Sequence, residues 1–267
     1  MANGTQDVLY ETKDGICYIT INRPQARNAL GGRGMKQLTD CWARYKDDKD
    51  ARVAIITGAG DQAFCAGLDL KRVASAKDEM DDYIQQFQKW GQVETLGMFP
   101  RQLFLEKPTI AAINGPALAL GGILALQCDI KIASENATIG YTLVKLGWFP
   151  PYCHEFWQLG SPAAALQSLL TGEPVNAKDA YHFGFVSEVM PQARLMPRAI
   201  EIATKIRDAA PLAVKAVKVT WDTQPQNTSL WALHVFHDYA RRAELSEDAI
   251  EGPRAFAEKR KPRYTGK

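Results

Sequence analysis

The 267-residue sequence lacks several features that mark specialised classes of protein. No segment approaches the roughly 18 consecutive apolar residues that a membrane-spanning helix needs. The first twelve residues are polar and contain no apolar signal-peptide core, so we expect a cytoplasmic protein. The 32 Lys and Arg residues nearly balance the 30 Asp and Glu residues. This balance gives no sign of a dedicated nucleic-acid-binding protein, although a local basic patch for a phosphorylated ligand remains compatible with it.

Cysteine is also scarce and scattered. The five cysteines form no CxxC pair and no dense framework, so we expect reduced thiols and no structural zinc or other metal site. Apolar residues are nevertheless abundant, at 46 % of the chain. That share supplies a substantial core and excludes disorder as the main state.

Apolar patterning predicts alternating strands and helices in the first half of the chain and mainly helices in the second. No Ser/Gly linker, repeat or low-complexity run divides it. We therefore expect an α/β fold in one body with a helical C-terminal part. The expected strands cover residues 15–22, 52–57, 108–114, 129–133 and 137–140. The expected helices cover residues 33–48, 81–97, 161–170, 176–181, 197–208, 211–222, 230–243 and 247–259.

A glycine-containing turn follows the expected strand at 52–57. Gly58, Gly60 and Ala63 match the loose G-x-G-x-x-G/A pattern of dinucleotide-binding proteins. That reading requires a helix to open at the turn and an acidic residue after a second strand about 20 residues on. The sequence offers neither, so a dinucleotide site is kept only as an alternative.

Several short motifs follow one another in a defined order along nearly the whole chain, from about residue 8 to 264. Together they resemble the crotonase superfamily of enoyl-CoA hydratases and isomerases. The motifs are Asn22-Arg23-Pro24, Asn28-Ala29-Leu30, the segment 63–70 (AFCAGLDL), Asn114-Gly115-Pro116, Gly121-Gly122, Cys128-Asp129 and the segment 255–262 (AFAEKRKP). The resemblance implies a crotonase-like ββα spiral core over residues 1–195. It also implies a helical trimerisation region over 196–267 that folds as one unit with the core, and a homotrimer or homohexamer.

Members of this superfamily bind acyl-CoA thioesters and hold the thioester oxygen with two backbone amides. CoA is then part of the substrate, and no separate cofactor is expected. By position, the resemblance assigns the two amides to Leu68 and Leu120. The chain departs from the family pattern at Ala119-Leu120-Gly121, where small residues are usual. An amide needs no particular side chain, but the bulk of Leu120 must point away from the thioester.

The resemblance also implies contacts to the CoA moiety. One group of contacts comes from the loop before the first helix, a second from the segment after the first turn, and a third from the last helix of a neighbouring subunit. The basic run at 259–261 can equally be a solvated C-terminal surface. The assigned CoA-binding residues are Ala26, Arg27, Ala66, Leu68, Asp69, Leu70, Lys71, Phe256 and Lys259.

The acidic residues that this superfamily normally uses are missing. Ile123 and Leu143 occupy the two positions where hydratases carry glutamates, and Pro151 occupies the position of an aspartate in related enzymes. None of these three side chains can transfer a proton. The resemblance therefore does not support hydration by the usual pair of glutamates.

Other side chains that can transfer protons are expected on the wall of the acyl pocket. His154 is the first candidate because its intrinsic pKa suits proton transfer near neutrality. Glu155, Tyr141 and Tyr152 are further candidates, and Glu94 can enter the pocket from the helix at 81–97. Each of these side chains can equally be an ordinary helix or core residue.

These features leave several functions open. The leading one is an acyl-CoA hydratase, dehydratase or lyase with non-standard acid–base residues, acting through a thioester enolate. Others are an acyl-CoA decarboxylase, a β-keto acyl-CoA hydrolase and a non-catalytic acyl-CoA-binding homologue. No membrane or nucleic-acid partner is expected.

Overall fold

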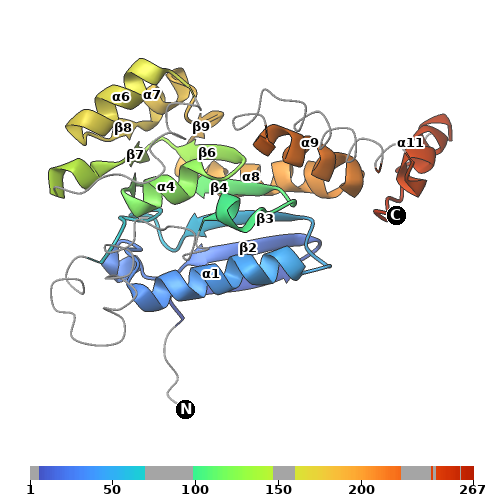
Figure 1. Ribbon diagram of the computed structural model, residues 1–267, viewed down its shortest axis with the longest axis horizontal. Coiled ribbons are helices and arrows are strands. Elements are labelled where there is room, and N and C mark those ends of the chain that lie inside the picture. Colours follow the sequence, from blue (N-terminus) through green and yellow to red (C-terminus); the bar gives the residue numbers. More distant parts are fainter. Residues whose placement is uncertain (1–5, 70–98, 147–159, 224–241, 243–244, 259) are drawn as a thin grey trace, which may run out of the picture.

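The computed structural model describes residues 6–69, 99–146, 160–223, 242, 245–258 and 260–267. Within these residues, six strands form one sheet in the order β1-β2-β3-β4-β6-β9 (Figure 1). β1 pairs with β2 as an antiparallel hairpin, and the strands from β2 to β9 are parallel to their neighbours. The six strands are β1 Val8–Lys13, β2 Ile16–Ile21, β3 Val53–Gly58, β4 Thr109–Ile113, β6 Ile130–Ser134 and β9 Glu188–Met190.

Side chains alternate between the two faces of this sheet, as the two-residue period of a strand requires. Ile56 belongs to the apolar cluster that includes Trp42 of helix α1 (Gly32–Asp47), and α1 runs along that face (Figure 1). Ile55 belongs to a second cluster with Leu195 of helix α8 (Gln192–Arg207). The sheet is thus covered on both faces, and the parallel strands are buried.

A second, three-stranded sheet lies beside the first and carries the short buried helix α4 (Leu120–Leu126) against it. Its strands are β5 Ala117–Leu118, β7 Thr138–Gly140 and β8 Val175–Asn176. The further helices are α6 Pro162–Thr171, α7 Ala177–His182, α9 Pro211–Thr223 and α11 Glu247–Ala257, with 3-10 turns η1 Pro24–Ala26, η3 Pro100–Leu103 and η4 Thr142–Leu146.

The C-terminal helices α9 and α11 extend away from the strands (Figure 1). α9 is held to the core by buried Lys218, whose ammonium lies 2.7 Å from Asp129; it also lies 2.8 Å from Asp222 on the same helix. The expected division after residue 195 falls inside α8, which packs on the main sheet. That division remains a prediction.

The α/β organisation, with strands concentrated in the first half, is confirmed. The prediction was incomplete at β1, β5, β8 and β9, which it missed, and the helices expected at 81–97 and 230–243 lie outside the described residues. It was also wrong about the start of α8, which begins at Gln192 rather than Pro197. Proline is typical of the first turn of a helix, but Pro197 lies in the second turn of α8, where its missing amide removes one backbone hydrogen bond from the helix.

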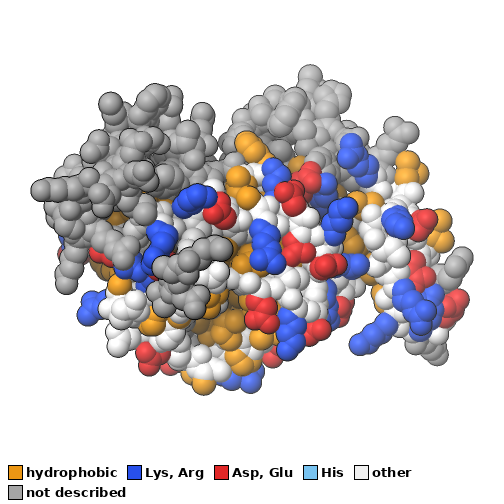
Figure 2. All heavy atoms as spheres, turned by 90° about the horizontal axis from the view of Figure 1, so that it is seen from below, with side chains coloured by type: hydrophobic (Ala, Val, Ile, Leu, Met, Phe, Trp, Pro, Cys, Tyr) orange, Lys and Arg blue, Asp and Glu red, His pale blue; other side chains and the backbone are white. Residues whose placement is uncertain are grey.

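Positive and negative side chains are interspersed over the face shown in Figure 2, in keeping with the small net charge. No helix in the described part of the chain combines the length and the apolar character needed to cross a bilayer.

Candidate active site

Two buried asparagines shape the chain at the carboxyl ends of β3 and β4. Asn114 accepts from the Gly58 amide at 3.1 Å and donates to the Gly58 and Gly60 carbonyls, each at 2.9 Å. Asn28 donates to the Ala59 and Ala63 carbonyls at 3.0 and 2.7 Å. These side chains replace regular secondary structure as partners for the backbone. No helix begins at Gly60, so the dinucleotide alternative is wrong.

The segment after this turn runs beside Leu30 as a short parallel bridge with Leu68. The Leu30 amide donates to the Gly67 carbonyl at 2.8 Å, and the Asp69 amide donates to the Leu30 carbonyl at 2.9 Å. Successive peptide groups of an extended segment point to opposite sides. The Leu68 amide therefore faces away from Leu30.

The second turn lies against the first. Cys65 and Ala117 form a bridge, and a methyl group built on Gly67 would lie 3.1 Å from the Ala119 Cβ and 3.6 Å from the Leu120 nitrogen. Gly67 has a φ of +100°, so a side chain there is opposed both by the backbone conformation and by this close approach.

Leu120 is the first residue of α4, and the first amides of a helix lack intrahelical acceptors. Among the described residues, neither the Leu120 amide nor the Leu68 amide donates to any acceptor. The fold thus brings two backbone N–H groups, neither with an acceptor among the described residues, close together beside the ends of β3 and β4. Two such donors can hold an oxygen that gains negative charge during a reaction.

The residue before Leu120 departs from ordinary backbone geometry. Ala119 has a φ of 50° and a ψ of −117°, a combination that usually requires glycine. Its amide donates to the Gly140 carbonyl at 2.8 Å, and its carbonyl accepts from the Ile123 amide at 3.0 Å. These bonds keep α4 starting at Leu120.

The structure confirms no acid–base residue. Ile123 and Leu143 are buried apolar side chains. Tyr141 is fully buried, and its ring approaches to 3.3 Å of a methyl built on Gly122. His154, Glu155, Tyr152, Glu94 and Pro151 lie outside the described residues.

The expected CoA-binding residues fall into two groups. Ala26 and Arg27 end η1, with Arg27 exposed, and the Arg27 carbonyl accepts from the Ala66 amide at 3.1 Å. Leu68 and Asp69 follow on the same segment and are half-buried. The fold therefore brings these five residues together, while their contacts with CoA remain predictions. Leu70, Lys71, Lys259 and the side chain of Phe256 lie outside what the structure describes.

Gln127, at the end of α4, belongs to none of the motifs that the sequence offers. The residue is 1 % exposed, and among the described residues neither the oxygen nor the nitrogen of its side-chain amide has a hydrogen-bond partner. Residues four and seven apart share a helix face, so Gln127 lies on the side of Ile123 and Leu120. The available signal was one polar residue at the end of the apolar run LGGILAL.

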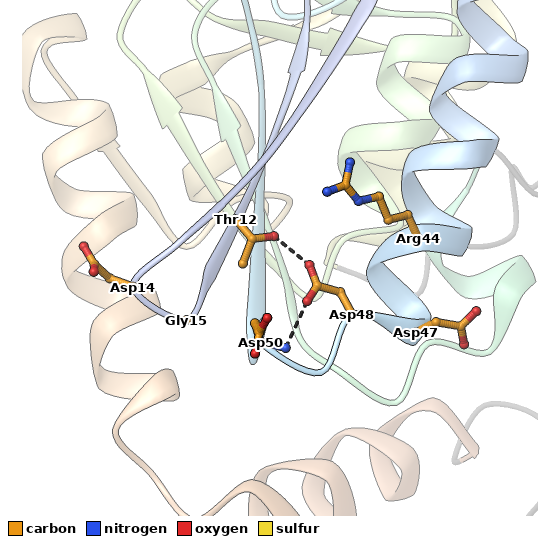
Figure 3. Close-up of a pocket in the computed structure, with 7 residues that line it drawn as sticks. All are labelled: Thr12, Asp14, Gly15, Arg44, Asp47, Asp48 and Asp50. Carbon is orange, nitrogen blue, oxygen red and sulfur yellow. Dashed lines mark hydrogen bonds between the residues drawn. The ribbon is translucent and has the colours of Figure 1, made fainter.

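A separate acidic hollow lies near the opposite ends of the strands, around the β1–β2 turn and the end of α1 (Figure 3). Asp14, Asp47, Asp48 and Asp50 line it together with Arg44, Thr12 and Gly15. The Asp48 carboxylate accepts hydrogen bonds from the Thr12 hydroxyl and the Asp50 amide (Figure 3). Across the described residues, no three His, Cys, Asp or Glu side chains are arranged to hold a metal ion.

Comparison with solved structures gives an independent view of the fold. The chain is similar to a crystal structure of an enoyl-CoA hydratase from Bacillus anthracis, with a TM-score of 0.86 and 31 % sequence identity. The match covers 98 % of this chain and all of that one. The crotonase-like fold expected from the sequence is therefore confirmed.

Comparison of sequences leads to the same family as the comparison of structures. The chain is 36 % identical over 265 residues to an (E)-benzylidenesuccinyl-CoA hydratase from Thauera aromatica, covering 97 % of this chain and 99 % of the relative. It is 37 % identical over 270 residues to a carnitinyl-CoA dehydratase from Escherichia coli K12, covering 97 % and 98 %. The family model described as enoyl-CoA hydratase/isomerase matches residues 11–267. The chain therefore belongs to the enoyl-CoA hydratase/isomerase family, the crotonase superfamily that its motifs resemble.

Proposed function

We propose that this protein is an acyl-CoA hydratase, dehydratase or related lyase that stabilises a thioester enolate between the amides of Leu68 and Leu120. The observation that carries the proposal is that the turns bearing these two amides lie against each other, while neither amide has an acceptor among the described residues. The relatives named above as a hydratase and a dehydratase match nearly their whole length, which supports the same reaction class.

In the dehydration direction, a base removes the α-proton of a β-hydroxyacyl thioester. The electron pair moves toward the thioester oxygen, where the two amides stabilise the developing negative charge. The α–β double bond then forms as the β-hydroxyl accepts a proton and leaves as water. Loss of one such donor typically costs about 10²–10³-fold in rate.

The proton transfers need a side chain other than those at the usual positions, because Ile123 and Leu143 are apolar. We assign this role first to His154, with Glu155, Tyr152 and Tyr141 as the next candidates. The support is elimination together with the intrinsic pKa of histidine, which lies near neutrality.

We assign binding of the CoA moiety to Ala26, Arg27, Ala66, Asp69, Leu70 and Lys71, with Phe256 and Lys259 contributed by a neighbouring subunit. The described part of this assignment forms one continuous strip beside the Leu68 amide, joined by the bond from Ala66 to Arg27. Figure 1 shows α11, which contains Phe256, at the far end of the molecule from α4, which supports a contact with another subunit's site.

A second candidate function is an acyl-CoA decarboxylase, and the apolar side chains of Ile123 and Leu143 at the usual acid–base positions favour it. Loss of carbon dioxide leaves the electron pair on the α-carbon, so the reaction needs enolate stabilisation and no base for the first step. A β-keto acyl-CoA hydrolase and a non-catalytic homologue remain as outcomes of the same test.

The test is turnover of a panel of β-hydroxyacyl-, enoyl-, malonyl- and β-keto-CoA thioesters, with products identified by mass spectrometry. We expect water to be added to or removed from at least one member, and crotonyl-CoA to be hydrated poorly because two acid–base residues are missing. Release of carbon dioxide alone would favour the decarboxylase, and release of free CoA the hydrolase. Rapid hydration of crotonyl-CoA would contradict the argument from the missing glutamates.

The assignment of His154 is tested on the substrate found in that panel. His154→Gln should lower kcat about 10²–10⁴-fold and remove one limb of the pH–rate profile, with CoA affinity unchanged. Glu155→Gln is the matched neighbour and should have a smaller effect. An unaltered kcat in His154→Gln would reject the acid–base role and favour the decarboxylase or the non-catalytic homologue.

A further inference from the structure

The Arg23 guanidinium lies buried behind the first amide of the candidate site. Arg23 follows β2, and only 6 % of the residue is exposed. Its Nη2 atom lies 2.9 Å from the Asp69 carboxylate, and its Nη1 atom donates to the Ala29 carbonyl. Its Nε atom lies 3.8 Å from the Asp7 carboxylate.

These partners flank the place where the Leu68 amide is presented. Asp69 follows Leu68, and Ala29 precedes Leu30, the residue paired with Leu68. Arg23 therefore joins the two segments at the same point as the backbone bonds of Leu30. A planar guanidinium can direct separate N–H groups at a carboxylate and a carbonyl, whereas an ammonium acts as a point charge.

An amide that binds an oxyanion must be held in place without being hydrogen-bonded itself. Its direction is then fixed only through its neighbours. On one side of Leu68, the Gly67 carbonyl is bonded to Leu30, and on the other, Asp69 is bonded to Leu30 through its amide and to Arg23 through its carboxylate. The carboxylate side chain is 14 % exposed and the guanidinium 7 %, so solvent screens this pair weakly.

We infer that Arg23 is a positioning residue, which orients the Leu68 amide toward the substrate oxygen by holding Asp69 and Ala29 together. The inference rests on the proposed function, because it assumes that Leu68 is one of the two oxyanion donors. It also gives the loop of Ala26 and Arg27 a mechanical link to the reacting end of the thioester, since the same loop contains Ala29.

The chain provides a matched control at Arg33. Arg33 donates to both oxygens of Asp7, at 3.0 and 2.7 Å. It shares this partner with Arg23, and no contact between Arg33 and Asp69 is found among the described residues. Arg33→Lys therefore tests the general effect of weakening the Asp7 cluster without touching the link to Asp69.

The experiment measures the carbonyl stretching frequency of butyryl-CoA, labelled with ¹³C at the thioester carbon, when bound to each variant. Saturated butyryl-CoA cannot undergo hydration, and two aligned amides shift its carbonyl band to lower frequency. We expect Arg23→Lys to lose most of this shift and to lower kcat about 10–100-fold, the scale of a displacement near 1 Å. CoA affinity, measured by calorimetry, and the Arg33→Lys spectrum should stay as in the wild type.

Asp69→Asn provides a second test if Arg23→Lys does not fold, because it preserves side-chain shape while removing the charge; since Asp69 is also assigned to CoA binding, its spectrum is recorded at saturating butyryl-CoA. It should lose part of the carbonyl shift, whereas a purely structural pair would lower the melting temperature and leave the band of the folded protein unmoved. The latter result overturns the inference. A wild-type protein that binds butyryl-CoA with no carbonyl shift would instead refute the two-amide proposal itself.

Discussion

At the scale of single residues, Ala119 shows how the second amide is presented. A non-glycine residue in such a conformation costs about 1–3 kcal/mol. The bonds of Ala119 to Gly140 and Ile123 hold it there. The strain is therefore maintained by β7 and α4, and its result is that the Leu120 amide comes first in the helix with no acceptor among the described residues.

Relief of this strain gives a first prediction. Ala119→Gly should raise the free energy of unfolding by about 1 kcal/mol, because the released strain exceeds the added backbone entropy of glycine. Denaturant unfolding measures the change. Ala125→Gly, in the interior of the same helix, should be destabilising. If Ala119→Gly is destabilising as well, contact of the Ala119 methyl with Gly67 outweighs the backbone strain.

A second residue-scale effect concerns Asp48 in the acidic hollow of Figure 3. Burial alone would raise the pKa of Asp48, but the Tyr10 and Thr12 hydroxyls, each at 2.7 Å, and the Asp50 amide at 2.9 Å outweigh it and lower the pKa to about 2. A lowered carboxyl pKa stabilises the fold above the unfolded-state value, which is about 4. That stability is lost as the pH falls through the folded-state pKa.

The prediction for Asp48 follows from this loss of stability as the pH falls. Asp48→Asn should lower the free energy of unfolding at pH 7 by about 1–2 kcal/mol, since it weakens hydrogen bonds to a charged group. The difference from the wild type should shrink as the pH falls from about 4 to about 2, as followed by thermal unfolding. Exposed Asp47→Asn is the matched control and should change little. A pH-independent difference would show that the charge of Asp48 is not involved.

At the scale of elements, sequence patterns located the helices and strands that carry a clear apolar period of their own. The helix expected at 33–48 is α1, and its large apolar residues at helical spacing, Met35, Leu38, Trp42 and Tyr45, are all fully buried. β1 was missed although Asp14-Gly15 is a typical hairpin turn, with φ values of 50° and 78°. β8 and β9 have two and three residues and are defined by their partners, so no local period identifies them.

Helix α4 gives the third prediction, through Gln127. A buried amide without partners costs about 1–3 kcal/mol, so Gln127→Met should raise the unfolding free energy by about 1 kcal/mol. Gln37→Met is the control, because the Gln37 oxygen accepts from the Asp7 and Val8 amides at 2.8 and 3.1 Å. That control should be destabilising. Unchanged stability in Gln127→Met with a raised KM would indicate instead that Gln127 meets the acyl group.

At the scale of the whole molecule, the motifs predicted which segments meet, and the structure supplied how they are held. The resemblance placed the candidate amides at Leu68 and Leu120, and the fold brings their turns into contact. It did not reveal the roles of Asn28, Asn114 or Arg23, because each bonds to a group that is distant in sequence: the two asparagines to backbone, and Arg23 to the Asp69 carboxylate. Such pairings depend on tertiary structure, and a local pattern does not encode them.

The C-terminal helices present apolar side chains that the described residues leave uncovered. Val217 and Trp221 are 71 % and 61 % exposed, and their spacing of four places them on one face of α9. Leu245 and Ile250 are 74 % and 65 % exposed beside and on α11. This distribution supports the proposal that the C-terminal region joins the subunits of a trimer or hexamer.

The last prediction joins this assembly to binding. Trp221→Glu should shift the protein toward monomers in light scattering, because a buried interface tryptophan commonly contributes about 2 kcal/mol or more. Leu170→Glu, a 72 % exposed apolar residue on α6, is the control and should leave the assembly intact. If Phe256 and Lys259 contact the CoA of a neighbouring subunit, the monomeric variant should also bind CoA more weakly, as measured by calorimetry. A monomer with unchanged CoA affinity would place the whole CoA site within one chain, and a trimer that tolerates Glu at position 221 would place the interface elsewhere.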